Sequence, residues 1–198
     1  NVTRENQIPI GFKAGILPHK FTYLGKGARI WERIVGDPTY KMGQLELDTL
    51  KEFLRGFHIK YPLNIIHLGP GEGREVPAII STVTPPNIKK YFLVDISPEM
   101  LKLAFRNLKP AFPDVRFQTV NADILKADEL RFAVEYSPKL ILLIGNGGIL
   151  SNPEIFPNVR HVMKVGDYVL FTLSTYADQI KKSLYDSYRI PPVLKLFN

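Results

Sequence analysis

The chain has 198 residues, of which 45% are hydrophobic and 23% charged, as expected for one globular domain. It contains no cysteine, which excludes disulfides, thiolate metal sites and cysteine nucleophiles and favours a cytoplasmic protein. The net charge is +7, but the basic residues are scattered, which favours solvated faces over nucleic acid binding, and no apolar run is long enough to span a membrane.

The N-terminal part is predicted to be an arm followed by helices. Residues 1–20 contain several prolines and glycines and show little periodicity, which indicates an extended segment. Helices are predicted over 27–35 and 44–57, the second from apolar residues at three-to-four spacing, with a turn over 36–40. We expect residues 1–60 to cover a functional site.

From residue 61 onward, predicted strands and helices alternate. The strands are predicted at 63–68, 91–95, 115–120, 139–145 and 167–174. The helices are predicted at 74–82, 98–109, 127–134, 153–163 and 176–187. This alternation predicts an α/β fold, with residues 61–198 forming a Rossmann-like parallel sheet flanked by helices and joined by right-handed crossovers.

The most informative segment is the glycine-rich turn after the first predicted strand. Gly69, Gly71 and Gly73 suit a strand that turns sharply into a helix while its backbone N–H groups approach a ligand. Asp95 ends the next predicted strand, where a carboxylate suits the hydroxyls of a ribose. Arg74 stands where a G-x-G-x-x-G pattern needs glycine, so the pattern favours S-adenosylmethionine over NAD as the cofactor.

Two further loops are expected at the same edge of the sheet. After the third strand, Asp123 can accept a hydrogen bond from the adenine amine while Ala122 and Ile124 flank the ring; the alternative is an aspartate that caps the next helix. Gly145 and Asn146 end the fourth strand, where they suit the floor beneath a methyl donor or form a plain connecting loop.

The helix that follows Asp95 has a clear start signal. Ser97 is the predicted N-cap and Pro98 the first helical residue. Because Ser97 fills the capping position, we expect the carboxylate of Asp95 to be free for a ribose. His67 and Trp31 are both expected to be core residues.

In its glycine-rich turn and the loops after the predicted strands, the chain resembles class I S-adenosylmethionine-dependent methyltransferases, and more closely the histidine-specific methyltransferase family. The segments that carry the resemblance are 21–27, 31–34, 37–40, 68–71, 94–97, 143–146 and 164–167. The resemblance implies cofactor contacts at Gly69, Gly71, Asp95, Ile96 and Asp123. It also implies that the phenols of Tyr23 and Tyr40 orient an amino-acid amine.

The chain departs from the resembled family at several positions. His67 stands where a carboxylate usually anchors the methionine amine of the cofactor; either Glu72 replaces it or the cofactor is bound more weakly. Lys41 stands where a second tyrosine often occurs, and Ile149-Leu150 replaces a dipeptide with a substrate-holding asparagine. Five predicted strands are fewer than the seven of a complete methyltransferase sheet, so we expect a sheet truncated at the C-terminus.

These observations predict an enzyme that uses S-adenosylmethionine, releases S-adenosylhomocysteine and N-methylates a small amine or amino acid. Two alternatives are a nucleic-acid methyltransferase, motivated by the basic charge, and a non-catalytic cofactor-binding domain, motivated by His67, Leu150 and the short sheet. An NAD enzyme is disfavoured by Arg74. We expect no metal, and the sequence predicts no oligomeric state.

Overall fold

The computed structural model describes residues 23–59, 61–145 and 153–173. Within them, the strands form one five-stranded parallel sheet with the order β3-β2-β1-β4-β5. The strands are β1 (Leu63–Leu68), β2 (Ile88–Asp95), β3 (Phe117–Asn121), β4 (Lys139–Leu143) and β5 (Tyr168–Phe171). The order reverses between β1 and β4, and ligands of open α/β sheets bind beyond the carboxyl ends of the strands at such a switch point.

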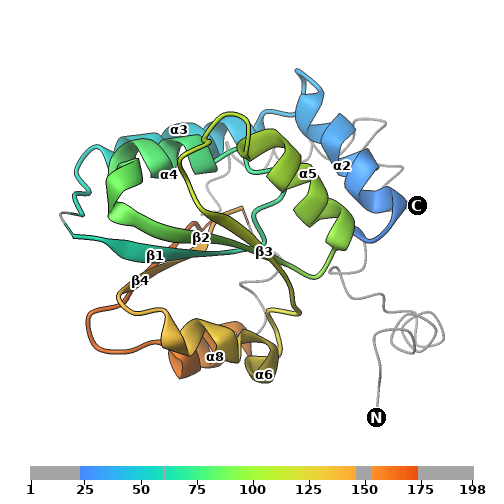
Figure 1. The fold of residues 1–198 in the computed structure, drawn as a ribbon. Coiled ribbons are helices and arrows are strands. Elements are labelled where there is room, and N and C mark those ends of the chain that lie inside the picture. The colour runs from blue at the N-terminus through green and yellow to red at the C-terminus, as the bar shows by residue number, and fades with distance from the viewer. Residues whose placement is uncertain (1–22, 60, 146–152, 174–198) are drawn as a thin grey trace, which may run out of the picture.

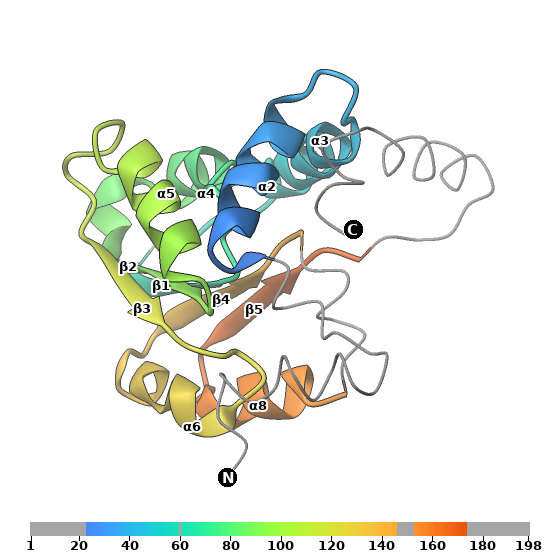
Figure 2. The ribbon, with the colours of Figure 1, turned by 90° about the vertical axis from the view of Figure 1, so that its right-hand side faces the viewer.

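Helices cover both faces of this sheet (Figures 1 and 2). On one side lie α2 (Lys26–Gly36), α3 (Met42–Leu54), α4 (Val76–Val83) and α5 (Pro98–Leu108). On the other side lie α6 (Ala127–Leu130) and α8 (Ile155–Val162), and two 3₁₀ segments are η2 (Pro85–Asn87) and η3 (Arg131–Glu135). The predicted α/β architecture, a Rossmann-like parallel sheet with flanking helices, is confirmed.

Two apolar cores lie on the two faces of the sheet. Every residue of β1 is buried, because helices cover both of its faces. One core joins Leu50 and Leu54 of α3 to Ile65 of β1, and the other joins Ile66 of β1 to Val159 of α8. Helix α3 therefore shares a core with the sheet that follows it. The division of the chain at residue 60 stays a prediction.

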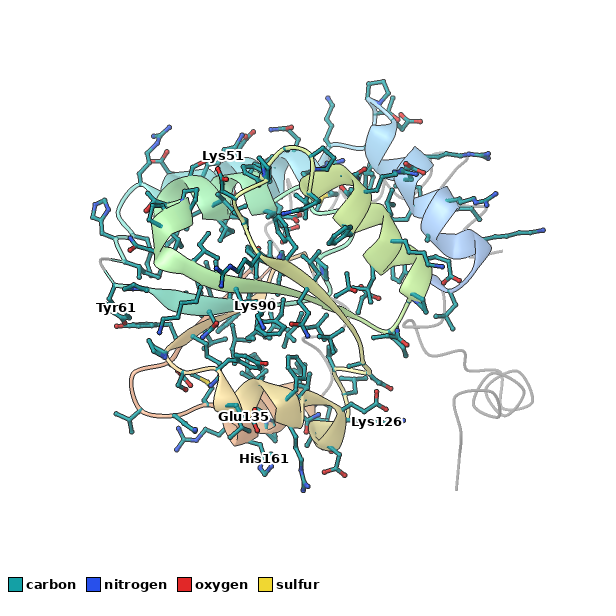
Figure 3. The ribbon with its side chains drawn as sticks, viewed as in Figure 1. Lys51, Tyr61, Lys90, Lys126, Glu135 and His161 are labelled. Carbon is teal, nitrogen blue, oxygen red and sulfur yellow. The ribbon has the colours of Figure 1, made fainter. Side chains whose placement is uncertain are left out.

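Several predicted boundaries differ from the observed ones by one to three residues, and three elements show the reason or the extent. Strand β2 begins three residues before the predicted 91, because the ammonium of Lys90 lies 5.3 Å from the ring centroid of Phe92 and 5.2 Å from that of Tyr136, which lets a lysine occupy the strand (Figure 3). Strand β4 ends before the predicted 145. The predicted helix over 127–134 is a short α-helix that tightens into a 3₁₀ segment.

The remaining predicted helix, over 176–187, lies outside the described residues. Among the described residues, no helix combines the length and the apolar character needed to cross a membrane.

A buried ion pair fastens the edge of the sheet where the strands begin. Lys139 and Asp167 have fully buried side chains, and the Lys139 ammonium donates to the Asp167 carboxylate. This carboxylate also accepts from the backbone N–H groups of Lys139 (3.0 Å) and Lys164 (2.7 Å) and from the Ser137 hydroxyl (3.0 Å). Burial alone raises the pKa of Asp167, but these hydrogen bonds outweigh it and hold the pKa below its usual value.

Candidate cofactor site

The glycine-rich turn after β1 has the predicted tight geometry. Gly69, Gly71 and Gly73 have φ angles of 67°, 55° and 87°, in the left-handed region that favours glycine. The N–H of Gly69 donates to the Val94 carbonyl of β2 at 2.7 Å. A Cβ at Gly73 would lie 2.7 Å from Cδ1 of Leu108. The third glycine therefore also lets α5 approach the loop.

Asp95 ends β2 at the predicted position, but its carboxylate is not free. Its Oδ1 accepts the Ser97 N–H at 2.8 Å, which corrects the expectation that Ser97 alone serves the start of α5. The predicted cap is present as well, because the Ser97 hydroxyl accepts the Met100 N–H at 3.2 Å. Burial raises the pKa of Asp95 to about 6, despite the opposing hydrogen bonds from the Ser97 and Ile96 N–H groups.

The loop after β3 is tied to the end of β2 by one side chain. The Asn121 amide donates to the carbonyl oxygens of Asp95 at 3.0 Å and Ile96 at 2.8 Å. The two strand ends are therefore held at one edge, as the prediction required. Sequence reasoning gave Asn121 no role, because an amide that bridges two strands is recognisable only once the strands are adjacent.

The predicted adenine residues on this loop are all buried. Asp123 is 2% exposed, and its Oδ1 accepts the Leu125 N–H at 3.1 Å. It is not the N-cap of α6, because Lys126 holds that position. Ala122 and Ile124 pack in the core between the sheet and α8. The carboxylate thus orders the turn before α6, and its contact with adenine stays a prediction.

A carboxylate from α3 reaches the end of β4. The N–H of Gly145, a residue with a φ of 72°, donates to Oε1 of Glu46 at 2.8 Å and to the Thr172 hydroxyl at 3.1 Å. Thr172 also donates to Glu46. The turn at Gly145 explains why the strand stops early. Sequence reasoning missed Glu46, since nothing in a helical periodicity marks a residue that reaches another element. Asn146 lies outside the described residues.

An aromatic row lies beside the glycine-rich turn. The Trp31 ring meets Tyr23 and Tyr40 edge-on, with centroid distances of 5.5 and 6.0 Å. Its Nε1 donates to Oε2 of Glu72 in the turn at 2.8 Å. Trp31 packs partly against a small core, as expected, but it also joins both predicted substrate tyrosines to the loop, which the sequence did not indicate. The Ser97 hydroxyl donates to the Tyr23 carbonyl at 2.9 Å.

A pocket of about 660 Å³ lies at the turn between α2 and α3, and its lining includes Tyr40 and Arg74. The guanidinium of Arg74 donates to the Val35 carbonyl at 2.6 Å and pairs with Glu72 at 3.2 Å. Arg74 therefore fixes α2 against the glycine-rich turn, a role beyond the absent glycine that the sequence indicated.

His67 is a buried core residue, as predicted. It is fully buried, its Nδ1 lies 3.0 Å from the Tyr91 hydroxyl, and burial lowers its pKa to about 3. Its imidazole is therefore neutral at physiological pH.

The comparisons with known proteins agree with this geometry. The family model described as "Histidine-specific methyltransferase, SAM-dependent" matches residues 5–192. This chain belongs to that family. It is therefore an S-adenosylmethionine-dependent methyltransferase, and S-adenosylmethionine is its cofactor. No curated protein matches the sequence.

Solved structures resemble the fold at low sequence identity. A candidate S-adenosyl-L-methionine-dependent methyltransferase from Methanococcus maripaludis has a TM-score of 0.61 at 18% identity, over 89% of this chain and 76% of its own. A protein from Pyrococcus horikoshii scores 0.52 at 20% identity, over 72% and 66% of the two chains. A SAM-dependent methyltransferase from Aquifex aeolicus scores 0.51 at 16% identity, over 79% and 87%.

The described residues fit this cofactor. Gly69 and Gly71 of the tight turn are partly exposed at the end of β1, and Asp95 ends the neighbouring strand at the same edge, where a ribose needs a carboxylate. Gly145, two residues after β4, lies on the other side of the switch point and is exposed. A partly exposed glycine turn, a carboxylate and an exposed glycine after β4 thus lie along one edge.

Proposed function

We propose that this methyltransferase N-methylates a small amine or amino acid, with the phenols of Tyr23 and Tyr40 orienting the amine. The observation that carries the proposal is the aromatic row, in which Trp31 stands between the two tyrosines and hydrogen-bonds to the glycine-rich turn. The phenols are therefore tied to the loop that meets the cofactor. The family description, which names histidine, supports an amino-acid acceptor.

The proposed cofactor contacts are the residues along the sheet edge. They are Gly69, Gly71, Gly73, Asp95, Ile96, Ala122, Asp123, Ile124, Gly145 and Asn146, the last outside the described residues. When bound, the cofactor supplies an electrophilic methyl group on a sulfonium sulfur. An amine attacks this methyl group through its lone pair, so the amine must be neutral. The protein must hold the amine in line with the bond from the methyl carbon to sulfur and exclude water.

The aromatic row provides these functions in the proposal. The rings of Tyr23, Trp31 and Tyr40 present apolar faces that exclude water, and the two hydroxyls can accept or donate a hydrogen bond to an amine. A tyrosine hydroxyl that passes on its own proton, or a water chain, carries the proton that the amine releases to solvent. Positioning then supplies most of the rate enhancement.

The test is methyl transfer to a panel of amines that includes histidine, with S-adenosylhomocysteine formation as the readout. Tyr23→Phe and Tyr40→Phe should each lower kcat/KM about tenfold or more, while the dissociation constant of S-adenosylhomocysteine stays within twofold. Tyr61→Phe is the control, because Tyr61 lies before β1, at the opposite edge of the sheet (Figure 3). Full activity of both variants would contradict the assigned role.

A nucleic-acid substrate finds less support. Figure 3 shows Lys51 on the helical layer above the sheet and Lys126 on the layer below it. Basic side chains on opposite faces do not make one electropositive track for a phosphate backbone. Methylation of RNA or DNA with no turnover of any amine would favour this alternative.

A cytoplasmic location stays a prediction from the lack of cysteine.

A further inference from the structure

Glu46 of α3 places a carboxylate where β4 and β5 end. Its Oε1 accepts the N–H of Gly145 at 2.8 Å and also the hydroxyl of Thr172. The N–H of Thr172 in turn donates to the carbonyl of Leu143, the last residue of β4, at 3.1 Å. These contacts fix the carboxylate beyond the carboxyl ends of two neighbouring strands, next to the switch point where ligands of open α/β sheets bind.

The second oxygen of this carboxylate has no donor. Among the described residues, none donates a hydrogen bond to Oε2 of Glu46, and no lysine or arginine pairs with it. Glu46 is half-buried, but within the described ranges its Oε2 is not one of the buried polar atoms without a partner, so solvent or a ligand can reach this oxygen. A Cβ on the exposed Gly145 would lie 3.3 Å from Oε2 and would crowd it. The glycine therefore keeps the oxygen accessible.

The proposed substrate tyrosine Tyr40 lies on the same side of α3. A Cβ on Gly43 would lie 3.7 Å from Cε1 of Tyr40, so the phenol ring rests against the first turn of the helix. Gly43 and Glu46 are three residues apart and are therefore neighbours on the helix surface. Burial, followed by the charges of Glu72 and Glu46, raises the pKa of Glu75, the residue before α4, to about 8. The charge of Glu46 thus also reaches the segment after the glycine-rich turn.

A carboxylate with one accessible oxygen at a ligand-binding edge suits a group that donates N–H bonds. Within the described ranges, no group of His, Asp and Glu side chains is arranged to hold a metal ion. The proposed methyl acceptor carries an amine, which is an ammonium in water and must become neutral before it attacks. A carboxylate oxygen can accept an N–H from either form.

We propose that Oε2 of Glu46 binds the amino group of the methyl acceptor and orients its lone pair. The inference rests on the proposed function, because it needs an amine as the acceptor. In the transfer the ammonium first loses a proton to solvent. Its nitrogen lone pair then forms the bond to the methyl carbon, and the electron pair of the broken carbon–sulfur bond stays on sulfur. Positive charge thus passes from sulfur to nitrogen, and a carboxylate beside the nitrogen stabilises this charge in the transition state.

Calorimetric titration of the full chain, loaded with S-adenosylhomocysteine, tests the inference with two probes. L-Histidine, the amino acid that the family description names, carries the amino group, whereas imidazolepropionic acid carries a hydrogen in its place. Glu46→Gln keeps an oxygen that can accept the Gly145 N–H but removes the charge. It should weaken histidine binding about tenfold or more and leave imidazolepropionate binding within twofold. If another amine of the panel is the acceptor, that amine and its deamino analogue form the pair.

Glu52→Gln is the matched control. Glu52 is exposed on the same helix and pairs with Arg55, so this variant removes the same charge away from the sheet. It should change neither affinity more than twofold. With the acceptor at saturation, Glu46→Gln should also lower kcat about tenfold or more, because the charge that reaches the nitrogen loses its stabilisation.

Three outcomes would overturn the inference. If the wild-type chain methylated an amine and Glu46→Gln matched it in affinity and turnover, the role of Glu46 would be refuted while the proposed function stood. Equal losses for both probes would make Glu46 only a tie between α3 and the ends of β4 and β5. If the wild-type chain methylated no amine, the proposed function would fail and the inference with it.

Discussion

The two edges of the sheet treat their carboxyl groups in opposite ways. At the edge where the strands begin, Asp167 is fully buried and has a cation and several N–H and O–H donors, and its pKa is lowered. At the edge where the strands end, Glu75 and Asp95 are partly exposed residues, and the burial of their carboxyl groups raises their pKa values to about 8 and 6. At the first edge the chain itself supplies the partners of the buried carboxylate, whereas at the second edge a ligand can supply partners for the carboxyl groups.

The largest effect on stability is expected when the buried ion pair between Lys139 and Asp167 is broken. Lys139→Met leaves the Asp167 carboxylate buried without its cation, so we expect the free energy of unfolding to fall by about 3–5 kcal/mol. Urea denaturation measures this loss. Arg131→Gln is the control, because its ion pair with Asp128 is exposed and should be worth less than about 1 kcal/mol. A loss below about 1 kcal/mol in Lys139→Met would contradict the assigned role of the pair.

A change at the edge where the strands end should lower the affinity for S-adenosylhomocysteine. Asp95→Asn keeps the shape of the side chain but removes its charge, so we expect S-adenosylhomocysteine to bind more weakly by about 1.5–3 kcal/mol in calorimetry. Stability should change little, since an amide oxygen can still accept the Ser97 N–H. Wild-type affinity would mean that Asp95 only orders the start of α5.

A third change tests whether the last glycine of the turn is needed for α5 to pack against it. Gly73→Ala places a methyl group 2.7 Å from the Leu108 side chain at a φ of 87°, so we expect a loss of stability of about 1–3 kcal/mol. Gly36→Ala is the matched control, because no atom lies within 4 Å of its added Cβ, and it should be neutral or slightly stabilising. Equal unfolding midpoints for the two variants would show that α5 does not depend on this glycine.

The last prediction concerns the pH dependence of stability. The folded pKa of Glu75, about 8, exceeds its unfolded value near 4.5, so the folded state holds the proton more tightly. The stabilisation is complete below pH 4.5 and is lost as the pH rises through about 8. Glu75→Gln should therefore flatten the fall in melting temperature between pH 5 and 9. Asp167 acts in the opposite direction, since its lowered pKa stabilises the fold at neutral pH and this contribution is lost on acidification. Parallel wild-type and Glu75→Gln profiles would contradict a raised pKa of Glu75.

Much of the fold could be predicted from local patterns. The glycines after β1, the carboxylate at the end of β2 and the Ser97 cap of α5 depend on residues close in sequence, and all three occur where they were expected. Lys139 was not recognised as a buried residue, because a lysine at a strand start is ordinarily exposed. Its partner is 28 residues away, and only strand pairing brings the two together.

The sequence by itself determined the order of strands and helices, the glycine-rich turn and the class of cofactor, because backbone conformation and hydrophobic periodicity are local properties. Tertiary structure alone decided which carboxyl groups have partners. Glu46 reaches Gly145 across 99 residues, and Trp31 reaches Glu72 across 41. Solvation and charge depend on every atom nearby, so the raised pKa of Glu75 follows from the packing of the fold and not from the local sequence.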